Sequence, residues 1–497
     1  MALGVAEIRD RAERFRALLL EERFRARAGQ KSWAEVAPLY AAEPILHHPD
    51  ALPAIERCLA SATGEEERRL RRLLAFTAEH RLLNANAALD DEFGFWASTA
   101  SLEIGGVDLP LSQAAFAVEG MEDREERRTL ERARAAALEE ALPLQLDRLN
   151  RWRVAAKELG YGGYLDAAER IHGFSIRGLV HEMRKVLAET EAAYRRQLAH
   201  HLRIHLGIGP EEAEGHDALR LSRMAWLDET GDSVSILDLV RNDLMEMELP
   251  MEAGGRLALH VEAFPGPGMR PYAAPVYVPD RILLLATPDT TQPIWKALLL
   301  ELGRAVHFAY TDPSLGFEDR ALGDVAVREA SGLLFERLLH APSWVERSRH
   351  LEASQLEEYL RLAAFIELFE VRREVARLEF ELELCESDRP GAMGVRWAEI
   401  LEAATGFRFD PRAFLEQLGQ RFGVATRLRA RMLAAQLGRE LRERFDAEWH
   451  RNPRAGEFLR RWFAASGCRD AAELSRSLEC ERLDAGALTG TILAPLQ

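Results

Sequence analysis

Apolar residues recur along most of the chain at positions i, i+3, i+4 and i+7, with charged residues between them. This spacing places the apolar side chains on one face of an α-helix, and the segments are rich in Ala, Leu, Glu and Arg, which favour helix. Their charged residues are interpreted as solvated helix faces. The pattern therefore predicts a mainly α protein, with its clearest helical segments at 64–86, 121–159, 187–206, 355–386 and 426–449.

Two segments depart from the helical pattern. Residues 100–110 alternate between apolar and polar positions around Gly105-Gly106, which is typical of a β-hairpin with a two-residue turn. Residues 256–286 hold short apolar runs interrupted by proline and glycine, and they predict two or three short strands. A small β-sheet is therefore expected within an otherwise helical fold.

The chain of 497 residues is long enough for two or more domains or for one large helical body. Domain boundaries are only weakly marked in the sequence, by a turn-rich stretch at 160–164 and a loop at 207–215. We predict an N-terminal helical region at 1–160, which contains the hairpin, and a second helical region at 161–497.

Composition and charge exclude several classes of partner. The formal net charge is -16, and such a field attracts neither nucleic acid nor an anionic membrane. The four cysteines lie far apart, without the paired spacing of a metal site, as in proteins of a reducing compartment. The N-terminus enters an amphipathic helix without an apolar signal core. A cytoplasmic protein with no nucleic-acid or membrane partner is expected.

The segment Leu300-Glu301-Leu302-Gly303-Arg304 carries the strongest chemical signal. It lies in a predicted helix at 295–310 and has the frame of H-E-x-x-H, in which histidines at i and i+4 bind zinc and the glutamate is the general base. Here the two ligand positions hold Leu300 and Arg304. Leucine has no lone pair to donate, and a guanidinium is always protonated and repels a divalent cation. The base position, Glu301, is retained.

The surrounding sequence extends the match beyond this helix. Together with the helix, three runs resemble the thimet oligopeptidase and oligoendopeptidase F family of zinc metallopeptidases, which act on short peptides; these runs are 272–286, 310–324 and 328–336. The resemblance covers about residues 150–480. The region 161–497 is accordingly expected to be peptidase-like.

The family pattern at the metal helix is H-E-x-G-H-x-x-H. Gly303 and His307 match it, while the two zinc histidines do not. The third ligand of the family is a glutamate on a following helix, and Glu329 lies 28 residues beyond Glu301, where the resemblance places it. The resemblance therefore implies that one of three zinc ligands remains.

A second part of the family's chemistry is also altered. A later helix of the family carries a phrase close to F-Y-x-x-x-Y-L-R-A-W, whose tyrosines polarise the scissile carbonyl. The matching segment here is 422–431, in which Gly423 and Arg427 stand at the tyrosine positions. The resemblance therefore implies that stabilisation of the oxyanion is lost together with the metal.

The resemblance also implies a fold. It is an elongated, two-lobed helical body with a deep substrate channel, the metal helix on the channel floor, and a small β-sheet at the cleft edge that grips an extended peptide by its backbone. The residues then expected at the cleft are Tyr272, Tyr277, Arg304, His307, Gly423 and Arg427.

These substitutions predict a catalytically inactive, oligopeptidase-like protein that binds peptides or an active partner peptidase and holds no zinc or other cofactor. The alternative is an active metallo-oligopeptidase that uses Glu301, His307 and Glu329 as unusual ligands. On a continuous helix, however, His307 points away from the Leu300/Arg304 face. A structural subunit with a filled cleft is a third interpretation, and the sequence leaves the oligomeric state open.

Arg304 is a candidate substitute for the missing metal. Without a cation, Glu301 and Glu329 would leave uncompensated negative charge in a partly buried place, which is costly unless it is paired. Arg304 lies three positions after Glu301 on the same helix face. We predict that it contacts Glu329 and holds the two helices together by ion pairing.

A separate group of histidines, His200, His201 and His205, lies on another predicted helix. His201 and His205 have the i, i+4 spacing that metal sites also use. The sequence places no carboxylate or cysteine nearby as a third ligand, so these histidines are interpreted as structural.

Overall fold

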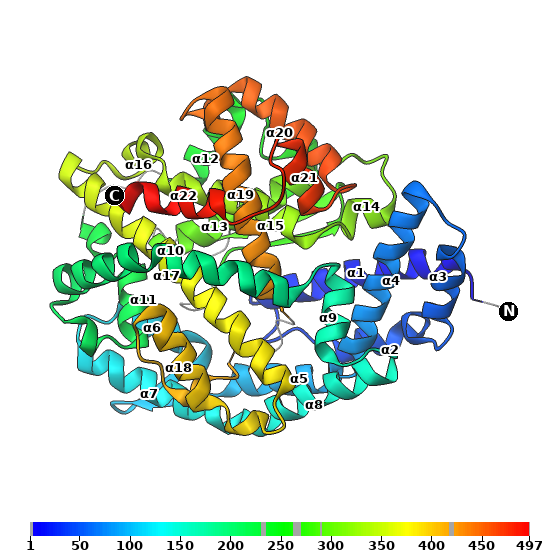
Figure 1. Cartoon of the computed structure of the whole chain (residues 1–497), viewed down its shortest axis with the longest axis horizontal. Helices are drawn as coiled ribbons and strands as arrows, with labels where there is room; N and C mark the ends of the chain where they lie inside the picture. The colour runs from blue at the N-terminus through cyan, green and yellow to red at the C-terminus, as the bar shows by residue number, and fades with distance from the viewer. Residues whose placement is uncertain (1–2, 230–234, 262–269, 289–290, 417–421, 497) are drawn as a thin grey trace.

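The computed structural model describes residues 3–229, 235–261, 270–288, 291–416 and 422–496. Within these ranges the chain is mainly helical with two small sheets, as the sequence predicts (Figure 1). The first half of the chain forms α1 (Val5–Arg27), α2 (Ala37–Ala42), α3 (Ala51–Leu59), α4 (Gly64–Asn84), α5 (Ala87–Thr99), α6 (Leu111–Gly120), α7 (Arg124–Glu140), α8 (Leu142–Glu158), α9 (Tyr164–His172), α10 (Ile176–His201) and α11 (Gly215–Arg223).

The second half forms α12 (Ile236–Glu246), α13 (Gln292–Ala309), α14 (Phe317–Ala321), α15 (Val325–Glu336), α16 (Pro342–Arg349), α17 (Ala353–Glu386), α18 (Gly394–Thr405), α19 (Gly423–Phe445), α20 (Pro453–Ser466), α21 (Ala471–Ser477) and α22 (Gly486–Leu493). In Figure 1, α12, α16, α20 and α21 lie along the top, α5, α7, α8 and α18 lie along the bottom, and α10 and α17 cross between them. None of the described helices is both long enough and apolar enough to cross a membrane.

Several helix boundaries differ from the sequence pattern. The segment 121–159 forms two helices, because Pro143 stands in the first turn of a new helix, where its missing N–H has no intrahelical partner to lose. The segment 426–449 forms α19, which ends at Phe445. The segment 187–206 belongs to α10, which continues as a single π-helical turn at Leu202–Leu206.

The predicted hairpin is present. Strands β1 (Ser101–Ile104) and β2 (Val107–Pro110) pair antiparallel. Gly105 and Gly106 connect them with φ values of 58° and 82°, which is the left-handed backbone that a two-residue hairpin turn requires and glycine adopts without a steric cost.

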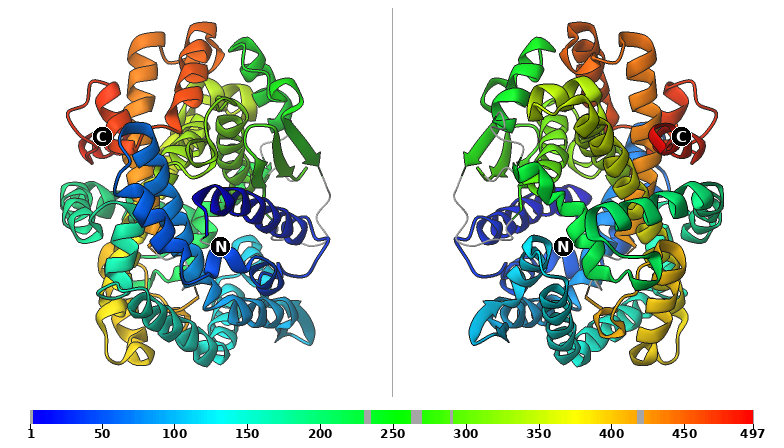
Figure 2. Two further views of the ribbon diagram at one scale, coloured as in Figure 1. Left: turned by 90° about the vertical axis from the view of Figure 1, so that its right-hand side faces the viewer. Right: turned by 90° about the vertical axis from the view of Figure 1, so that its left-hand side faces the viewer.

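The second sheet lies between two helices. Its strands are β3 (Leu257–Val261), β4 (Tyr272–Tyr277) and β5 (Arg281–Ala286), in the order β3-β5-β4; β3 is parallel to β5, and β4 is antiparallel to it. Alternate side chains of β4 and β5 pack against α1 on one face and join the main core, which includes α13, on the other. Figure 2 shows this sheet beside α1. Because both faces are buried, the strands read as apolar runs rather than as alternating sequence.

One hydrophobic core joins distant parts of the chain. It contains Phe15 and Trp152 from the first 160 residues together with Trp295, Phe365 and Leu433 from the rest. The division of the chain at residue 160 therefore stays a prediction, while the packing shows that the two regions share a core.

Candidate functional site

The degenerate motif lies on α13, whose sequence accounts for its limits. Pro293 stands in the first turn, where its fixed φ suits a helix start, and the helix ends at Ala309. Apolar residues fill most of its positions, and the helix is buried along nearly its whole length. Any polar side chain on α13 must therefore find a partner within the protein.

Two glycines bring α13 close to α15. A Cβ added at Gly303 would stand 2.5 Å from the Ser331 carbonyl oxygen, and one added at Gly332 would stand 2.6 Å from the Leu300 carbonyl oxygen. These separations are shorter than van der Waals contact, so the backbones meet where neither residue has a side chain. The close approach places Arg304 of α13 opposite Glu329 of α15.

Arg304 pairs with both carboxylates. Its Nη1 donates to Glu301 Oε1 at 2.8 Å, and its Nε lies 3.2 Å from Glu329 Oε1. The exposed fractions of the three side chains are 24% for Arg304, 11% for Glu301 and 12% for Glu329. Burial disfavours the charged guanidinium, but Glu329 and Glu301 outweigh it and raise the pKa of Arg304. The Arg304 to Glu329 contact predicted from the sequence is present.

Both oxygens of Glu301 are engaged. Oε1 accepts the bond from Arg304, and Oε2 accepts a hydrogen bond of 2.9 Å from the backbone N–H of Ala273 on β4. Burial raises the pKa of Glu301 and outweighs the opposing effect of Arg304 and the amide. The retained base position thus ties α13 to the sheet.

The residues at the family's metal position do not fit zinc. Leu300 offers no donor atom, and the Arg304 guanidinium contacts both Glu329, the ligand that the resemblance implies, and Glu301, the base position. A fixed positive charge at this position would repel a dication. No catalytic step through a metal is therefore derived for this site.

His307 lies in the core behind the motif. Its Nδ1 hydrogen-bonds with the hydroxyl of Ser331 at 2.8 Å, and its Nε2 with the hydroxyl of Ser466 at 3.2 Å. Burial, with a smaller contribution from Arg328, lowers the pKa of His307 to about 3. The expectation that His307 belongs to the cleft is corrected, because α13 turns its ring toward α15 and α20. The alternative ligand set of Glu301, His307 and Glu329 is not brought together.

A cavity of about 730 Å³ opens beside the motif. Leu300, Glu301 and Glu329 line it from α13 and α15, and Tyr272 and Arg427 line it from β4 and α19, as the resemblance implies. Its volume falls within the usual range of ligand pockets, about 300–1,000 Å³.

The polar side of α17 forms one wall of this cavity. Sequence reasoning treated the charged residues of this helix as solvated, but their spacing places several on one face that looks into the cavity: Glu370, Arg373, Glu374, Arg377 and Glu381. This face could have been recognised from the sequence, because its charged residues have helical spacing within a helix whose other faces are apolar.

Three arginines approach one another on this wall. Arg373 and Arg377 are one helical turn apart on α17, and Arg427 of α19 lies 3.8 Å from Glu374. Burial, then repulsion from Arg373 and Arg427, lowers the pKa of Arg377 to about 10. Glu374 and Glu381 on the same face oppose this shift, so the wall carries both signs of charge.

Deeper in the cavity, opposite charges pair. Arg431 of α19 donates to Glu374 at 2.8 Å and to Glu370 at 3.2 Å, and Lys296 of α13 also pairs with Glu370. These pairs connect α13, α17 and α19, so they fix three walls relative to one another.

Three other residues expected at the cleft, Arg304, Tyr277 and Gly423, are not among the residues that line this cavity. Tyr277 ends β4 and has an exposed fraction of 41%. Gly423 begins α19, after a residue, Phe422, with a φ of 58°.

The outer edge of β4 is partly covered by side chains. The Ala273 N–H donates to Glu301, and the Pro275 carbonyl oxygen accepts a hydrogen bond of 2.8 Å from Arg16 of α1. These two backbone groups are thus already bonded, so they are not available to an added peptide strand.

Comparison with known proteins addresses the fold. No family model matches the sequence, and no curated protein matches it. PZ peptidase A, solved with an inhibitor, matches with a TM-score of 0.66 at 14% identity, over 100% of this chain and 97% of that chain. A protein assigned as oligoendopeptidase F from Bacillus anthracis gives 0.63 at 13% identity, over 95% of this chain and 84% of that chain. The carboxypeptidase of Pyrococcus furiosus gives 0.59 at 15% identity over 100% of both chains.

The chain shares its fold with helical metallopeptidases. At these identities the likeness shows the fold alone. It agrees with the sequence resemblance on architecture, and the differences at Leu300 and Arg304 are features of this chain.

The histidine group is the second polar cluster of interest. His200, His201 and His205 converge on Glu358 of α17. The expectation that no carboxylate stands nearby is wrong, because Glu358 lies more than 150 positions away in sequence and only the packing of α17 on α10 brings it there. Among the described residues, a group with donor atoms spaced for a metal ion is His200, His201 and Glu358.

Proposed function

We propose that this protein is a non-catalytic relative of oligopeptidases that binds short peptides in the cavity beside α13. The observation that carries the proposal is the Arg304 guanidinium, which contacts both Glu301 and Glu329 at the position where the resembled family holds zinc. A cavity of peptidase-like architecture remains next to it.

The loss of turnover follows from three features. Arg304 opposes binding of a dication, both Glu301 oxygens are engaged, and the tyrosine positions hold Gly423 and Arg427. Peptide hydrolysis of this kind needs a polarised carbonyl, an activated water and an oxyanion donor. The proposal is that none of the three is supplied here.

Peptide binding is supported by the charges of the cavity. An anion placed among Arg373, Arg377 and Arg427 would relieve the repulsion between them, in competition with Glu374 and Glu381, and a terminal carboxylate suits guanidinium geometry. Carboxylates also line the cavity, so an amino group or a basic side chain of the ligand would meet opposite charge there. The proposed ligand is therefore a short peptide whose C-terminal carboxylate binds Arg373, Arg377 and Arg427.

The test compares fluorescent peptides that have free or amidated C-termini. Binding by fluorescence anisotropy should favour the free carboxylate. Arg377→Ala should weaken that binding about tenfold or more, since a hydrogen bond to a charged group contributes about 1.5–3 kcal/mol. Arg184→Ala is the matched control, because Arg184 pairs with α17 through Glu379 outside the cavity.

The same peptides should stay intact during long incubation, with or without a chelator. Chelator-sensitive cleavage that disappears in Glu329→Gln would establish the active-enzyme alternative. Equal affinity for free and amidated peptides, or no binding by a folded protein, would contradict the proposed ligand.

A further inference from the structure

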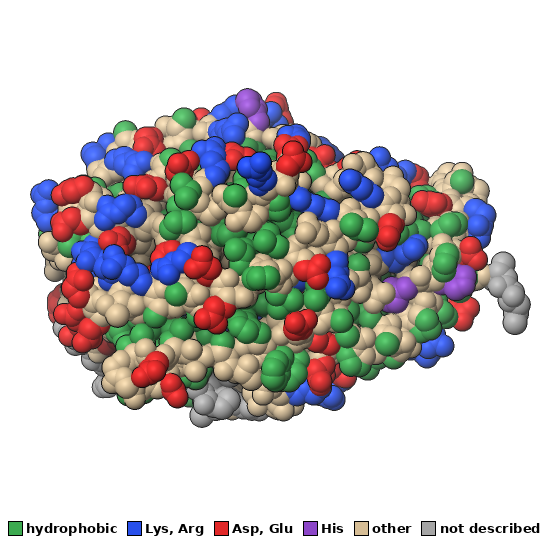
Figure 3. All heavy atoms as spheres, turned by 90° about the horizontal axis from the view of Figure 1, so that it is seen from below, with side chains coloured by type: hydrophobic (Ala, Val, Ile, Leu, Met, Phe, Trp, Pro, Cys, Tyr) green, Lys and Arg blue, Asp and Glu red, His purple; other side chains and the backbone are tan. Residues whose placement is uncertain are grey.

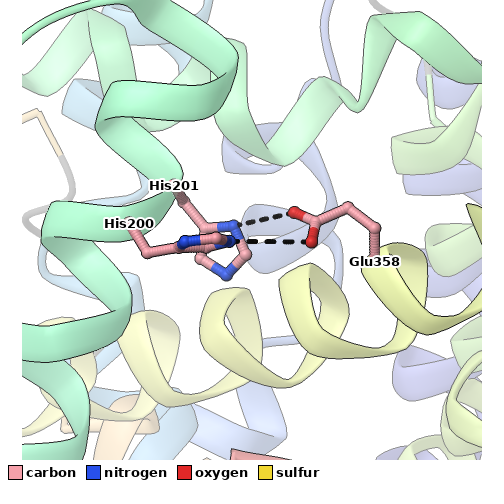
Figure 4. A group of neighbouring side chains, drawn as sticks. All are labelled: His200, His201 and Glu358. Carbon is pink, nitrogen blue, oxygen red and sulfur yellow. Dashed lines mark ion pairs between the residues drawn. The ribbon is translucent and has the colours of Figure 1, made fainter. Parts of the chain in front are cut away.

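The histidine cluster lies where α10 ends and α17 begins. His200 and His201 occupy the last turn of α10, and Glu358 lies in the second turn of α17. Figure 4 shows both rings directed toward the Glu358 carboxylate from the neighbouring helix.

The donor atoms have the separations of a metal site. His201 Nδ1 lies 3.3 Å from Glu358 Oε1, and His200 Nε2 lies 3.7 Å from Glu358 Oε2. The ligand atoms all lie within 4.8 Å of one another. Ligands about 2.0–2.1 Å from a tetrahedral zinc ion stand roughly 3.3–3.4 Å apart. Little movement is needed to close these three atoms around an ion.

His201 supplies an independent sign of a missing ligand. Its side chain has an exposed fraction of 0%, and neither ring nitrogen makes a hydrogen bond with a described residue. Nδ1 has only the 3.3 Å contact with Glu358, which is not a hydrogen bond. Buried polar atoms without a hydrogen bond are costly, and native proteins rarely leave one unsatisfied. An ion bound to Nδ1 would give this buried ring a partner.

The backbone next to the cluster is unusual. Leu202–Leu206 forms a π-helical turn directly after α10. Such turns are rare and occur frequently at functional sites. Here the turn carries His205, whose ring stacks on that of His201 at 5.6 Å, and whose Nε2 hydrogen-bonds with Glu358 Oε1 at 2.9 Å.

We propose that His200 Nε2, His201 Nδ1 and the Glu358 carboxylate bind one divalent transition-metal ion of the zinc class. His205 is a positioning residue that orients Glu358, as hydrogen-bonded partners orient ligands in metal sites. Zinc sites with three protein ligands commonly take water as the fourth, and the His200 side chain, with an exposed fraction of 38%, lies near solvent.

Arg361 is a cation that competes with a metal ion for Glu358, and it has a second carboxylate partner. Arg361 lies 3.6 Å from Glu358 Oε2, but its Nη2 donates to Glu357 at 2.6 Å. Arg361 therefore keeps a carboxylate partner when the metal neutralises Glu358. Imidazole nitrogens are ligands that zinc prefers.

The proposed ion would tie α10 to α17. Residues of α17 beyond Glu358, including Arg373 and Arg377, line the cavity beside α13. Metal binding would therefore fix the position of α17, which carries Arg373 and Arg377 on the cavity wall. The site is separate from Glu301 and Glu329, and it stands whether or not the protein binds peptides.

The test is calorimetric titration of Zn²⁺ into chelator-treated full-length protein. Wild type should bind one Zn²⁺ per chain and unfold at a higher temperature when it is bound. His200→Ala and Glu358→Gln, both at partly exposed positions, should abolish this binding while circular dichroism stays unchanged. His205→Ala should weaken binding about 10- to 100-fold. His181→Ala, at an exposed position on the same helix, is the control and should bind as wild type does.

Glu329→Gln separates this site from the degenerate motif. If Zn²⁺ binding survives Glu329→Gln and is lost in Glu358→Gln, the ion is at the histidine cluster. No binding by folded wild type, or binding that His200→Ala and Glu358→Gln leave intact, would overturn the proposal.

Discussion

At the scale of single residues, Arg304 decides the charge of the motif around Glu301. Its guanidinium contacts Glu301 and Glu329. The guanidinium therefore compensates the negative charge of both carboxylates. Removing one member of a buried ion pair leaves the other member without compensation, which is more costly than removing both.

Arg304→Ala should therefore lower the free energy of unfolding by about 2–4 kcal/mol. Glu329→Gln in the same chain should recover part of this loss, because it removes a carboxylate that has lost its partner. Urea unfolding of wild type, both single variants and the double variant measures the coupling, expected at about 1–3 kcal/mol. Strictly additive effects would show that Arg304 and Glu329 do not depend on each other.

At the scale of elements, the site depends on how closely α13 and α15 approach. Gly303 and Gly332 remove side chains where the two helices meet. Each glycine weakens its own helix by about 1 kcal/mol relative to alanine, so the contact must offset that cost. The same approach brings Ser331 within hydrogen-bonding distance of His307.

Gly303→Ala should destabilise the protein by about 1–3 kcal/mol, because its Cβ would overlap the Ser331 carbonyl oxygen and force the helices apart. Gly490→Ala is the control, since an added Cβ on α22 meets nothing within 4 Å and alanine favours helix. Thermal unfolding of both variants checks the prediction. A neutral Gly303→Ala would mean that α15 shifts at little cost.

At the scale of the whole molecule, the cavity is assembled from walls that are distant in sequence. The described part of its lining comes from β4, α13, α15, α17 and α19, among others. Leu300 and Arg427 lie on different walls, formed by α13 and α19. Elsewhere, on the face seen from below, acidic and basic side chains are interspersed with apolar ones (Figure 3).

Placing the family's histidines on α13 alone should therefore give zinc binding without peptide cleavage. Leu300→His with Arg304→His should recover zinc binding beside Glu329, while peptide cleavage stays undetectable, because Gly423 and Arg427 still offer no phenol. The experiment is best made with Glu358→Gln in the same chain, so that elemental analysis reports the cavity alone. Adding Glu329→Gln should remove the ion again. Rapid chelator-sensitive hydrolysis by the repaired protein would contradict the role given to α19.

Much of the local structure follows from sequence periodicity. The helices, the hairpin around Gly105-Gly106 and the three strands at 256–286 are determined by spacing and by turn residues, which act over short distances. The partnership of Arg304 with Glu329 was also predicted, because the resemblance supplied the long-range pairing. Helix ends depart from the pattern, because Pro143 divides 121–159. Residues 262–269, between the predicted strands, lie outside the described residues.

The tertiary structure decided which polar residues meet. His307 has the same spacing from Glu301 in any straight helix, yet only the packing of α15 and α20 places it between two serines. Glu358 joins the histidines, and the charges of α17 face a cavity, because helices distant in sequence pack side by side. Periodicity specifies the face of a helix on which a residue lies. What that face contacts is set by the folded chain as a whole, so sequence determined the elements and tertiary packing determined the sites.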